Sequence, residues 1–226
     1  LEIVILAAGQ GKRMLSDKPK VMHELAGKPM LTHVLNTARQ LNPLKVHVVV
    51  GDRATLVKAH YDEDPDLSWV EQAERLGTGH ATTQALPAIS DDSMVLVMLG
   101  DVPLMTKETL GHCVEMALAK GGVALVTADV VDPSGYGRII RGKDERIIAI
   151  VEERDANETQ RSITEVNTGV MAAPACLFKR FLAGLSDDNS QSEYYLTDVV
   201  VAAVHEDVPV SAVKAELPEE AVGVND

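Results

Sequence analysis

The chain has 226 residues, 46% of them hydrophobic and 24% charged, a composition that excludes an intrinsically disordered protein and is sufficient for a sizeable core. The formal net charge of −13 argues against a nucleic-acid-binding protein, which needs a basic face. No apolar run approaches the about 20 residues of a membrane span, and the two cysteines, Cys113 and Cys176, form no CxxC pattern. We therefore expect a cytoplasmic protein that binds no membrane and keeps both cysteines as buried thiols, without a disulfide or a zinc site.

Short β-branched runs alternate with helical stretches along the chain. Continuous apolar runs suit strands buried on both faces, and their alternation with helices predicts an α/β fold with a mostly parallel sheet. Two further runs, Gly135–Arg141 and Arg146–Val151, flank a polar turn and predict a hairpin that adds antiparallel strands, all within one domain over residues 1–226. The predicted strands are Ile3–Leu6, Val46–Val50, Met94–Leu99, Val123–Ala128, Ile147–Val151 and Gly169–Ala172. The predicted helices are Met30–Leu41, Ala54–His60, Gly79–Ala85 and Lys107–Lys120.

The first predicted strand runs into a segment with two glycines and two cations, LAAGQGKR. Ligands of open α/β sheets bind beyond the carboxyl ends of the strands, and glycine-rich backbone amides can point at phosphate oxygens. The segment is not the dinucleotide-binding GxGxxG, because Met14 stands at the third glycine position, and it is not GxxxxGK[ST]. Lys18, Lys20 and Lys28 follow closely, which predicts a focused anion site on an acidic protein. Taken alone, the glycines also fit an ordinary turn, and the lysines a solvated loop.

The order LAAGxGxR, followed by Lys18-Pro19-Lys20, resembles the signature of the nucleotidyltransferases that make nucleotide-diphospho-sugars. The resemblance implies the Rossmann-like fold of that family, with a loop that cradles a nucleoside triphosphate. It also implies that Arg13 and Lys20 are catalytic and contact phosphates. Fixed cations suit this role, since the α-phosphate gains negative charge during transfer. The loop residues that the resemblance places against the nucleotide are Leu6, Ala7, Ala8, Gly9 and Gly11.

The segment EQAERLGTGHA, residues 71–81, combines a side-chain amide with a glycine turn that opens a helix. An amide presents a donor and an acceptor together, which matches the imide edge of uracil. By itself, Gln72 is more often a surface residue than a base reader. The whole segment resembles the uridine-recognition segment of bacterial N-acetylglucosamine-1-phosphate uridylyltransferases, which implies that Gln72, Gly77 and Thr78 recognise the base.

The segment LGDVP ends an apolar strand with one carboxylate, Asp101. Mg²⁺ prefers few protein ligands together with phosphate oxygens and water, so a single aspartate at a strand end can begin a metal site. A turn or capping aspartate before the next helix is the alternative interpretation. The resemblance places Leu99, Gly100 and Asp101 in the substrate site. It also implies that Asn225, at the end of the chain, is a second metal ligand and a substrate contact.

Three strings in the second half, SGYGRI, VEE and EVNTG, resemble the sugar-side elements of the same family. The resemblance implies that Gly137, Glu152 and Asn167 hold an N-acetylhexosamine, whose hydroxyls suit such donors and acceptors. Glu153 is easily confused with Glu152, and the register relative to the preceding Ile-Val pair favours Glu152. A later string, SEYYLTD, is expected to line the sugar pocket, with its two tyrosines equally suited to the core.

The resemblance spans the chain from Ile3 to Asn225 with its motifs in order, although Leu99 stands where the family often has an aromatic residue. It is to the uridylyltransferase (pyrophosphorylase) domain of a bifunctional family, and implies uridylyl transfer from UTP to N-acetylglucosamine 1-phosphate with Mg²⁺. Such proteins usually continue into a left-handed β-helix that is an acetyltransferase, and a homotrimer is expected only for the full-length protein. No hexapeptide repeat occurs here, so we expect a truncated or a naturally domain-only form. A transferase for another nucleotide or sugar, and a nucleotide-sugar sensor without turnover, are the alternatives.

Overall fold

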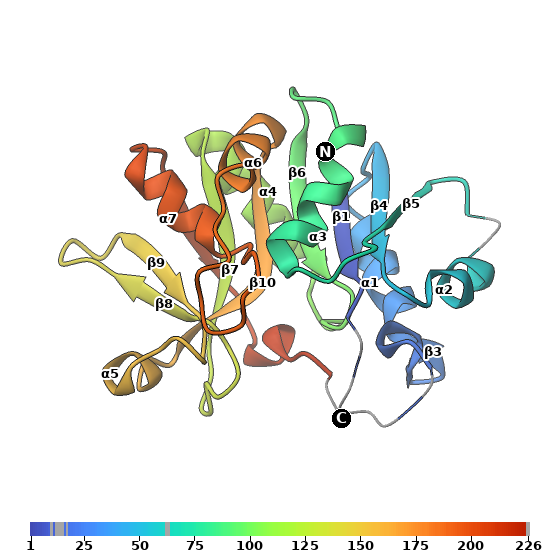
Figure 1. Ribbon diagram of the computed structural model, residues 1–226, viewed down its shortest axis with the longest axis horizontal. Helices are drawn as coiled ribbons and strands as arrows, with labels where there is room; N and C mark the ends of the chain where they lie inside the picture. The colour runs from blue at the N-terminus through green and yellow to red at the C-terminus, as the bar shows by residue number, and fades with distance from the viewer. Residues whose placement is uncertain (10, 12–15, 17, 62–63, 225–226) are drawn as a thin grey trace.

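A nine-stranded mixed sheet runs through the middle of the molecule (Figure 1). The computed structural model describes residues 1–9, 11, 16, 18–61 and 64–224. The seven strands of the main path are β1 (Glu2–Ala7), β4 (Lys45–Val50), β5 (Leu67–Glu71), β6 (Met94–Leu99), β7 (Val123–Asp129), β10 (Glu165–Pro174) and β11 (Val210–Lys214). Their order is β11-β7-β10-β6-β1-β4-β5, and the four strands from β6 to β5 are parallel. Strand β10 runs antiparallel to both β6 and β7, so the sheet changes direction beside β6.

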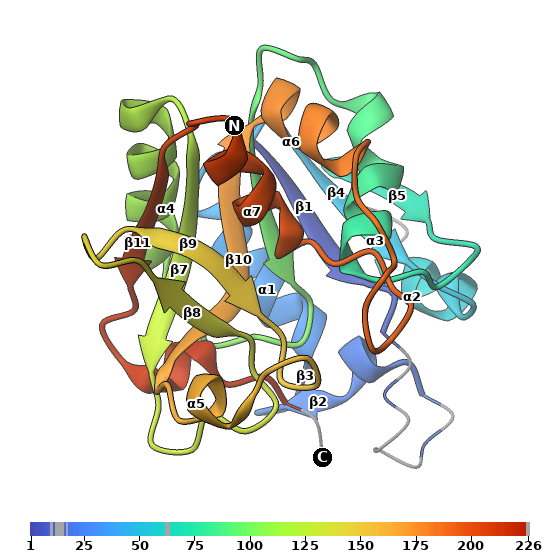
Figure 2. The ribbon, with the colours of Figure 1, turned by 60° about the vertical axis from the view of Figure 1, so that its left-hand side comes forward.

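Helices cover both faces of the sheet, because the strands are apolar on both sides and must be buried on both. One hydrophobic cluster includes Leu31, Val57 and Leu110 from the helices of one face, and the other includes Ala81 and Phe178 from the opposite face. Figure 2 shows the sheet between these layers. The helices of the first face are α1 (Met30–Arg39), α2 (Ala54–His60) and α4 (Lys107–Lys120). Those of the second are α3 (Thr78–Ala85), α6 (Ala175–Leu182) and α7 (Asp198–His205).

A hairpin projects from the sheet on the side of β10 (Figures 1 and 2). Strands β8 (Arg138–Arg141) and β9 (Ile147–Val151) pair antiparallel, and β8 joins β10 through the pair of Arg138 and Val166. A short helix, α5 (Glu158–Arg161), follows the hairpin. Minor elements are β2 (Glu24–Leu25), β3 (Lys28–Pro29) and the 3-10 turns η2 (Lys20–Met22), η3 (Leu86–Ala88) and η4 (Pro218–Ala221).

The predicted α/β class, the mostly parallel sheet and the antiparallel hairpin are confirmed. The sequence prediction missed β5, β11, α6 and α7, and gave β10 only its residues 169–172. Helix α1 ends at Arg39, two residues before the predicted end. In the described part of the chain, no helix is both long and apolar enough to cross a bilayer.

The prediction of two buried thiols is correct for Cys113 and wrong for Cys176. Cys113 faces the core from α4, and burial raises the pKa of its thiol to about 12. Cys176 is exposed, because α6 turns Phe178 and Phe181 toward the sheet and leaves Cys176 on the outer face of the helix.

Candidate active site

Strand β1 ends at Ala7, directly before the glycine segment, and Lys20 is buried in the turn η2 that follows this segment in the sequence. Gly11 has φ +57°, and a Cβ there would lie 2.9 Å from the Cβ of Lys20. A glycine is therefore needed for the loop to pack against the lysine. Arg13, the other predicted phosphate contact, lies outside the described residues.

Lys20 and Asp101 meet although 81 residues separate them in the sequence. The Lys20 ammonium pairs with Oδ2 of Asp101, and the two side chains are 10% and 26% exposed. Asp101 follows β6 through Gly100, whose N–H donates to the carbonyl of Leu6 at 2.9 Å. The glycine loop and the end of β6 thus bring the predicted phosphate contact and the predicted metal ligand together.

A cavity of about 600 Å³ opens beside this pair and is lined by most of the residues predicted to bind the nucleotide. We name it the nucleotide lobe. Its volume lies within the range of about 300–1,000 Å³ that is usual for ligand pockets. Its lining is Leu6, Ala8, Gly9, Lys20, Val21, Gln72, Arg75, Gly77, Thr78, Ala81, Leu99, Asp101 and Glu193.

Gln72, the predicted base reader, is only 3% exposed and is held by two internal hydrogen bonds. Its Nε2 donates to the carbonyl of Gly77 at 3.1 Å and lies 3.0 Å from Nδ1 of His80. The amide nitrogen is therefore engaged within the protein, and the carbonyl oxygen is the atom that suits a ligand donor such as the uracil N3–H.

A second cavity, of about 450 Å³, lies on the other side of Asp101 and holds the three predicted sugar contacts. We name it the sugar lobe. A Cβ on Gly137 would lie 3.4 Å from both carboxylate oxygens of Glu152, and the N–H of Asn167 donates to the carbonyl of Gly137 at 2.8 Å. The Oδ1 of Asn167 is buried and has no hydrogen-bond partner among the described residues. A buried amide oxygen without a partner is costly, which is consistent with a place for a ligand donor.

Glu152 and Glu153 have opposite surroundings. Glu152 lines the sugar lobe and accepts a hydrogen bond from Oγ1 of Thr197 at 3.0 Å. Burial raises the pKa of Glu152, and the nearby carboxylates of Asp198 and Asp155 raise it further, while the Thr197 hydrogen bond opposes the rise. Glu153 instead pairs with Arg138, which lowers the pKa of its carboxyl. Of the two glutamates, Glu152 therefore lines the cavity, and it is the one that the sequence register favoured for the sugar contact.

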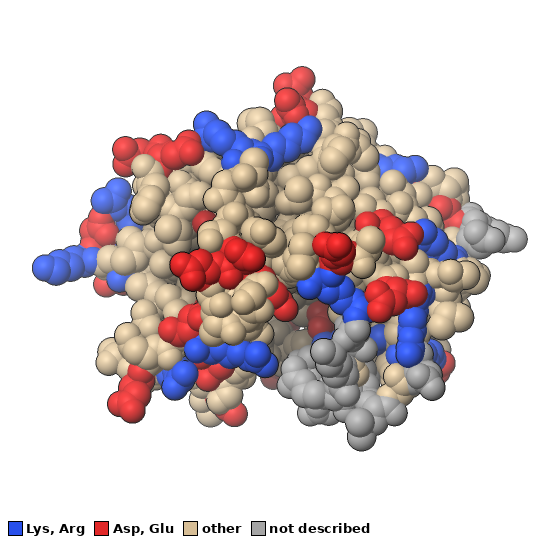
Figure 3. Space-filling view, viewed as in Figure 1, with Lys and Arg blue, Asp and Glu red and all other residues tan. Residues whose placement is uncertain are grey.

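Thr78, Leu99 and Asp101 line both lobes. The two cavities therefore meet at the Lys20–Asp101 pair. Figure 3 shows acidic and basic side chains close together around a narrow hollow near the middle of the face of Figure 1. Ligands that filled both lobes would therefore approach each other at this pair.

Not every predicted residue lines a lobe. Ala7 lines a third cavity, of about 240 Å³, which shares Ala8 and Gly9 with the nucleotide lobe. Gly100 and Gly11 line none of the three cavities and make close backbone contacts instead. Asn225 lies outside the described residues, but Val224 before it donates its N–H to the carbonyl of Asp101 at 3.0 Å.

The string SEYYLTD contributes Glu193 to the nucleotide lobe and Leu196 and Thr197 to the sugar lobe, whereas neither tyrosine lines a lobe and Tyr195 is buried. Sequence reasoning included Thr197 and Arg75 in predicted segments but gave neither a role of its own, although Arg75 lines the nucleotide lobe and pairs with Asp52. Their positions in the sequence could have indicated a role at the site, because Thr197 lies in the string SEYYLTD and Arg75 lies between the predicted base contacts Gln72 and Gly77.

Two solved structures share the fold at low sequence identity. A Bacillus anthracis protein assigned as a glucose-1-phosphate thymidylyltransferase, in complex with sucrose, has a TM-score of 0.79 at 17% identity and covers 95% of this chain and 87% of its own. A UDP-glucose pyrophosphorylase complexed with UDP-glucose has a TM-score of 0.74 at 19% identity and covers 91% and 87%. The expected nucleotide-diphospho-sugar transferase fold is therefore confirmed.

Relatives in sequence are much closer. The bifunctional protein GlmU of Xanthomonas axonopodis pv. citri is 48% identical over all 226 residues, and that of Xanthomonas oryzae pv. oryzae is 47% identical over the same length. The chain spans 49% of the length of each of these relatives, about half. Residues 3–187 match the family described as the MobA-like NTP transferase domain, so the chain belongs to this family of nucleotidyltransferases.

Proposed function

We propose that this chain transfers a uridylyl group from UTP to N-acetylglucosamine 1-phosphate and releases UDP-N-acetylglucosamine and pyrophosphate. The observation that carries the proposal is the Lys20–Asp101 pair at the point where the two lobes meet. The identity of 48% to the GlmU proteins, together with the family-like motifs of the sequence, supports the uridine and N-acetylglucosamine specificity. The proposal concerns only the half of those bifunctional relatives that this chain spans.

Asp101, at the junction, is suited to a divalent cation, and we propose that it holds Mg²⁺ together with Asn225, which lies outside the described residues. No cluster of three or more His, Cys, Asp or Glu side chains suited to a metal occurs among the described residues. A single carboxylate at a strand end, completed by an amide oxygen and substrate phosphates, is the donor set that Mg²⁺ prefers. A cation held there would supply positive charge to neutralise and orient the triphosphate.

The protein's own part is to position the substrates and to stabilise charge. The attacking oxygen of the sugar phosphate is already anionic, so no general base is needed. Lys20 supports the negative charge that develops at the α-phosphate, while the two lobes hold the uridine and the sugar in line. Glu152 and Asn167 accept hydrogen bonds from the sugar, and Gln72 accepts one from the base.

The proposal is tested by pyrophosphate release with Mg²⁺, N-acetylglucosamine 1-phosphate and each of UTP, CTP and dTTP. We expect UTP to be preferred, and glucose 1-phosphate to be a poorer acceptor. Preference for CTP or dTTP would establish a relative of different base specificity, and binding of UTP without pyrophosphate release would establish a sensor.

Lys20→Met in the same assay examines the junction itself. The substitution keeps the length of the side chain and removes its charge, so we expect turnover to fall about 10²–10³-fold, as for the loss of an oxyanion donor. Lys28→Met, an exposed lysine of the same basic stretch, is the control. Unchanged turnover in a folded Lys20→Met protein would remove Lys20 from the site.

A further inference from the structure

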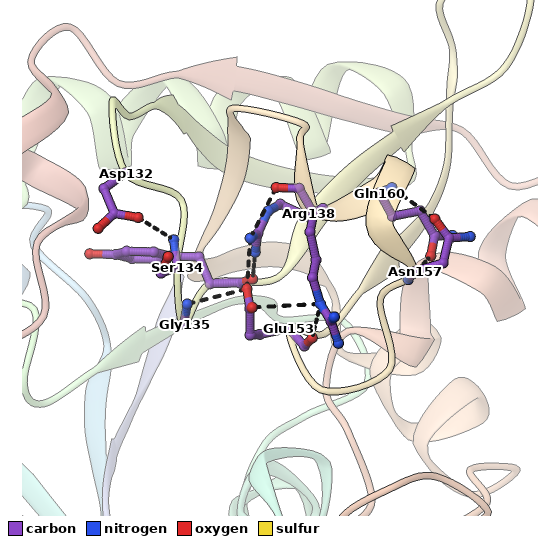
Figure 4. A network of polar contacts seen from close by, with 9 residues as sticks. Asp132, Ser134, Gly135, Arg138, Glu153, Asn157 and Gln160 are labelled. Atoms are coloured by element: carbon purple, nitrogen blue, oxygen red, sulfur yellow. Dashed lines mark hydrogen bonds and ion pairs between the residues drawn. The ribbon is translucent and has the colours of Figure 1, made fainter.

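The turn of residues 134–137 lines the sugar lobe, and the side chain of Arg138, which lines neither lobe, donates a hydrogen bond to its backbone. Arg138 is 1% exposed and is the first residue of β8. Its Nη1 donates to the carbonyl of Tyr136, and its Nη2 donates to Oε2 of Glu153 at 2.6 Å and to the carbonyl of Arg161 at 3.4 Å. One guanidinium therefore joins the turn, Glu153 just after β9 and the last residue of α5. Figure 4 shows its contact with Glu153.

Glu153 completes the connection from the other side. Its Oε2 also accepts the N–H of Gly135 at 3.3 Å, and its Oε1 lies 3.8 Å from Nε of Arg161. Figure 4 shows the Glu153 carboxylate between Gly135 and the Arg138 guanidinium. Because Glu153 follows Glu152 directly, the backbone that carries Glu152 into the sugar lobe is held by the same ion pair.

We propose that the Arg138–Glu153 ion pair is a positioning pair, which fixes Gly137 and Glu152 relative to each other and thereby sets the affinity for the sugar 1-phosphate. This inference rests on the proposed function. The two residues do not line either lobe themselves. They act through the backbone on either side of the pair, which carries Gly137 and Glu152. These two residues lie close together, since a Cβ on Gly137 would be in contact with the Glu152 carboxylate.

The effect is specific to the sugar side. All four residues of the turn line the sugar lobe, and none of them lines the nucleotide lobe. The Lys20–Asp101 pair at the junction and the Arg138–Glu153 pair behind the turn share no residue. Displacement of the turn therefore changes the binding of the acceptor while the triphosphate site keeps its geometry.

The same strand provides a matched control in Arg141. Its guanidinium forms a two-point ion pair with Glu165, at 2.8 and 2.7 Å, and donates to the carbonyl of Glu145. None of these three residues lines a lobe. Loss of this pair removes an arginine–carboxylate interaction from the same strand, at a more exposed arginine, without releasing the turn.

The test measures KM for both substrates, and kcat, in the wild type, Glu153→Ala, Glu153→Gln, Arg138→Lys and Arg141→Ala. We expect Glu153→Ala to raise KM for N-acetylglucosamine 1-phosphate between about tenfold and a hundredfold, as for an active-site displacement caused at a distance. Glu153→Gln, which keeps an acceptor for Gly135, should have an intermediate KM, as should Arg138→Lys. KM for UTP should stay within about twofold in all of them, and Arg141→Ala should match the wild type.

Each outcome has one meaning. If the pair had a purely structural role, the melting temperature and the amount of active protein would be lowest in Glu153→Ala, intermediate in Glu153→Gln and highest in the wild type, while KM for the sugar phosphate stayed unchanged. That result overturns the inference. Equal increases in both KM values, or the same increase in Arg141→Ala, overturn it as well. A wild type that uses UTP with another sugar phosphate and not with N-acetylglucosamine 1-phosphate overturns the proposed function first. Normal wild-type turnover with an unaffected Glu153→Ala overturns the positioning role alone.

Discussion

The position of Glu152 in the sugar lobe disfavours the ionised form of its carboxyl and raises its pKa. Burial is the largest cause of its raised pKa, and Asp198, Asp155 and Glu193 add repulsion. Asp198 has a raised pKa for the same reasons, burial first and Asp155 second. A carboxylate that already experiences repulsion from three other carboxylates suits a neutral, hydroxyl-rich ring, and a phosphate is better placed at the Lys20 end.

The raised pKa of Glu152 has a definite sign in stability. Below the pKa of about 4.5 that Glu152 has in the unfolded chain, the carboxyl is protonated in both the folded and the unfolded state, and its contribution to the free energy of unfolding is fully present. This contribution is lost as the pH rises through the higher pKa of the folded state. We therefore expect Glu152→Gln to unfold with a higher free energy than the wild type at neutral pH, with a difference that disappears as the pH falls below the unfolded value near 4.5. Urea unfolding at several pH values measures it, and the same variant should bind the sugar phosphate more weakly.

The neighbouring carboxylate is the control for this experiment, because its pKa shift has the opposite sign. Arg138 lowers the pKa of Glu153, so its contribution is present above the unfolded value and is lost as the pH falls. Glu153→Gln should therefore be less stable than the wild type at neutral pH. If both substitutions changed stability in the same direction, the assigned surroundings of Glu152 and Glu153 would be wrong.

At the scale of elements, the sequence was most informative where apolar runs were continuous. The predicted bounds of β6, β9, α2 and α4 are those of the structure. Helix α7 was missed because its run of valines, VVVAAV, has the composition of a strand, and it is helical because Val199, Val200 and Ala203 pack on one side against the sheet. Strand β5 is a short edge strand with a polar Ser68, which breaks the apolar pattern.

The site was predictable as a set of local strings and not as a set of contacts. Gly137, Glu152 and Asn167 were identified within their own segments and lie together because β8, β9 and β10 are neighbours. The Lys20–Asp101 pair and the Thr197–Glu152 hydrogen bond join distant segments. No local pattern encodes such pairs, since they depend on how the elements pack.

Helix α3 depends on one glycine for its place beside the nucleotide lobe. Gly77 precedes the helix with φ 106° and ψ 179°, a conformation that is essentially confined to glycine. A Cβ there would lie 2.5 Å from the carbonyl oxygen of Tyr194, which accepts the N–H of Gly79 at 2.8 Å. The carbonyl of Gly77 also accepts a hydrogen bond from the Gln72 amide, so this glycine connects the docking of α3 to the side chain proposed to contact the base.

We expect Gly77→Ala to lower the free energy of unfolding by about 3 kcal/mol, because backbone strain and a steric clash add. Gly121→Ala is the matched control: Gly121 ends α4 with φ +60°, and no atom lies within 4 Å of the position that a Cβ would take, so only strain of about 1 kcal/mol is expected. Urea unfolding compares the two, and KM for UTP should rise in Gly77→Ala alone. Equal losses of stability would show that the contact with Tyr194 does not matter.

For the whole molecule, the decisive feature is that the sheet changes direction beside β6. The nucleotide lobe lies over the parallel half and the sugar lobe over the half that contains β10 and the hairpin. Asp101 follows β6 at this boundary, where open α/β sheets usually bind their ligands. A ligand that fills both lobes therefore connects the two halves of the fold.

UDP and UDP-N-acetylglucosamine separate the contributions of the two lobes to the stability of the whole fold. A ligand that binds only the folded state at about 100 times its Kd adds about 2.7 kcal/mol, which corresponds to a rise in Tm of about 5–10 °C for a domain of this size. At equal concentrations, with Mg²⁺ present, UDP-N-acetylglucosamine should raise Tm more than UDP, because it also fills the sugar lobe. The excess should disappear in Glu152→Ala, while the shift with UDP stays the same. Equal shifts for both ligands in the wild type would mean that the sugar lobe contributes no binding, and the assignment of its residues to the N-acetylhexosamine would then fail.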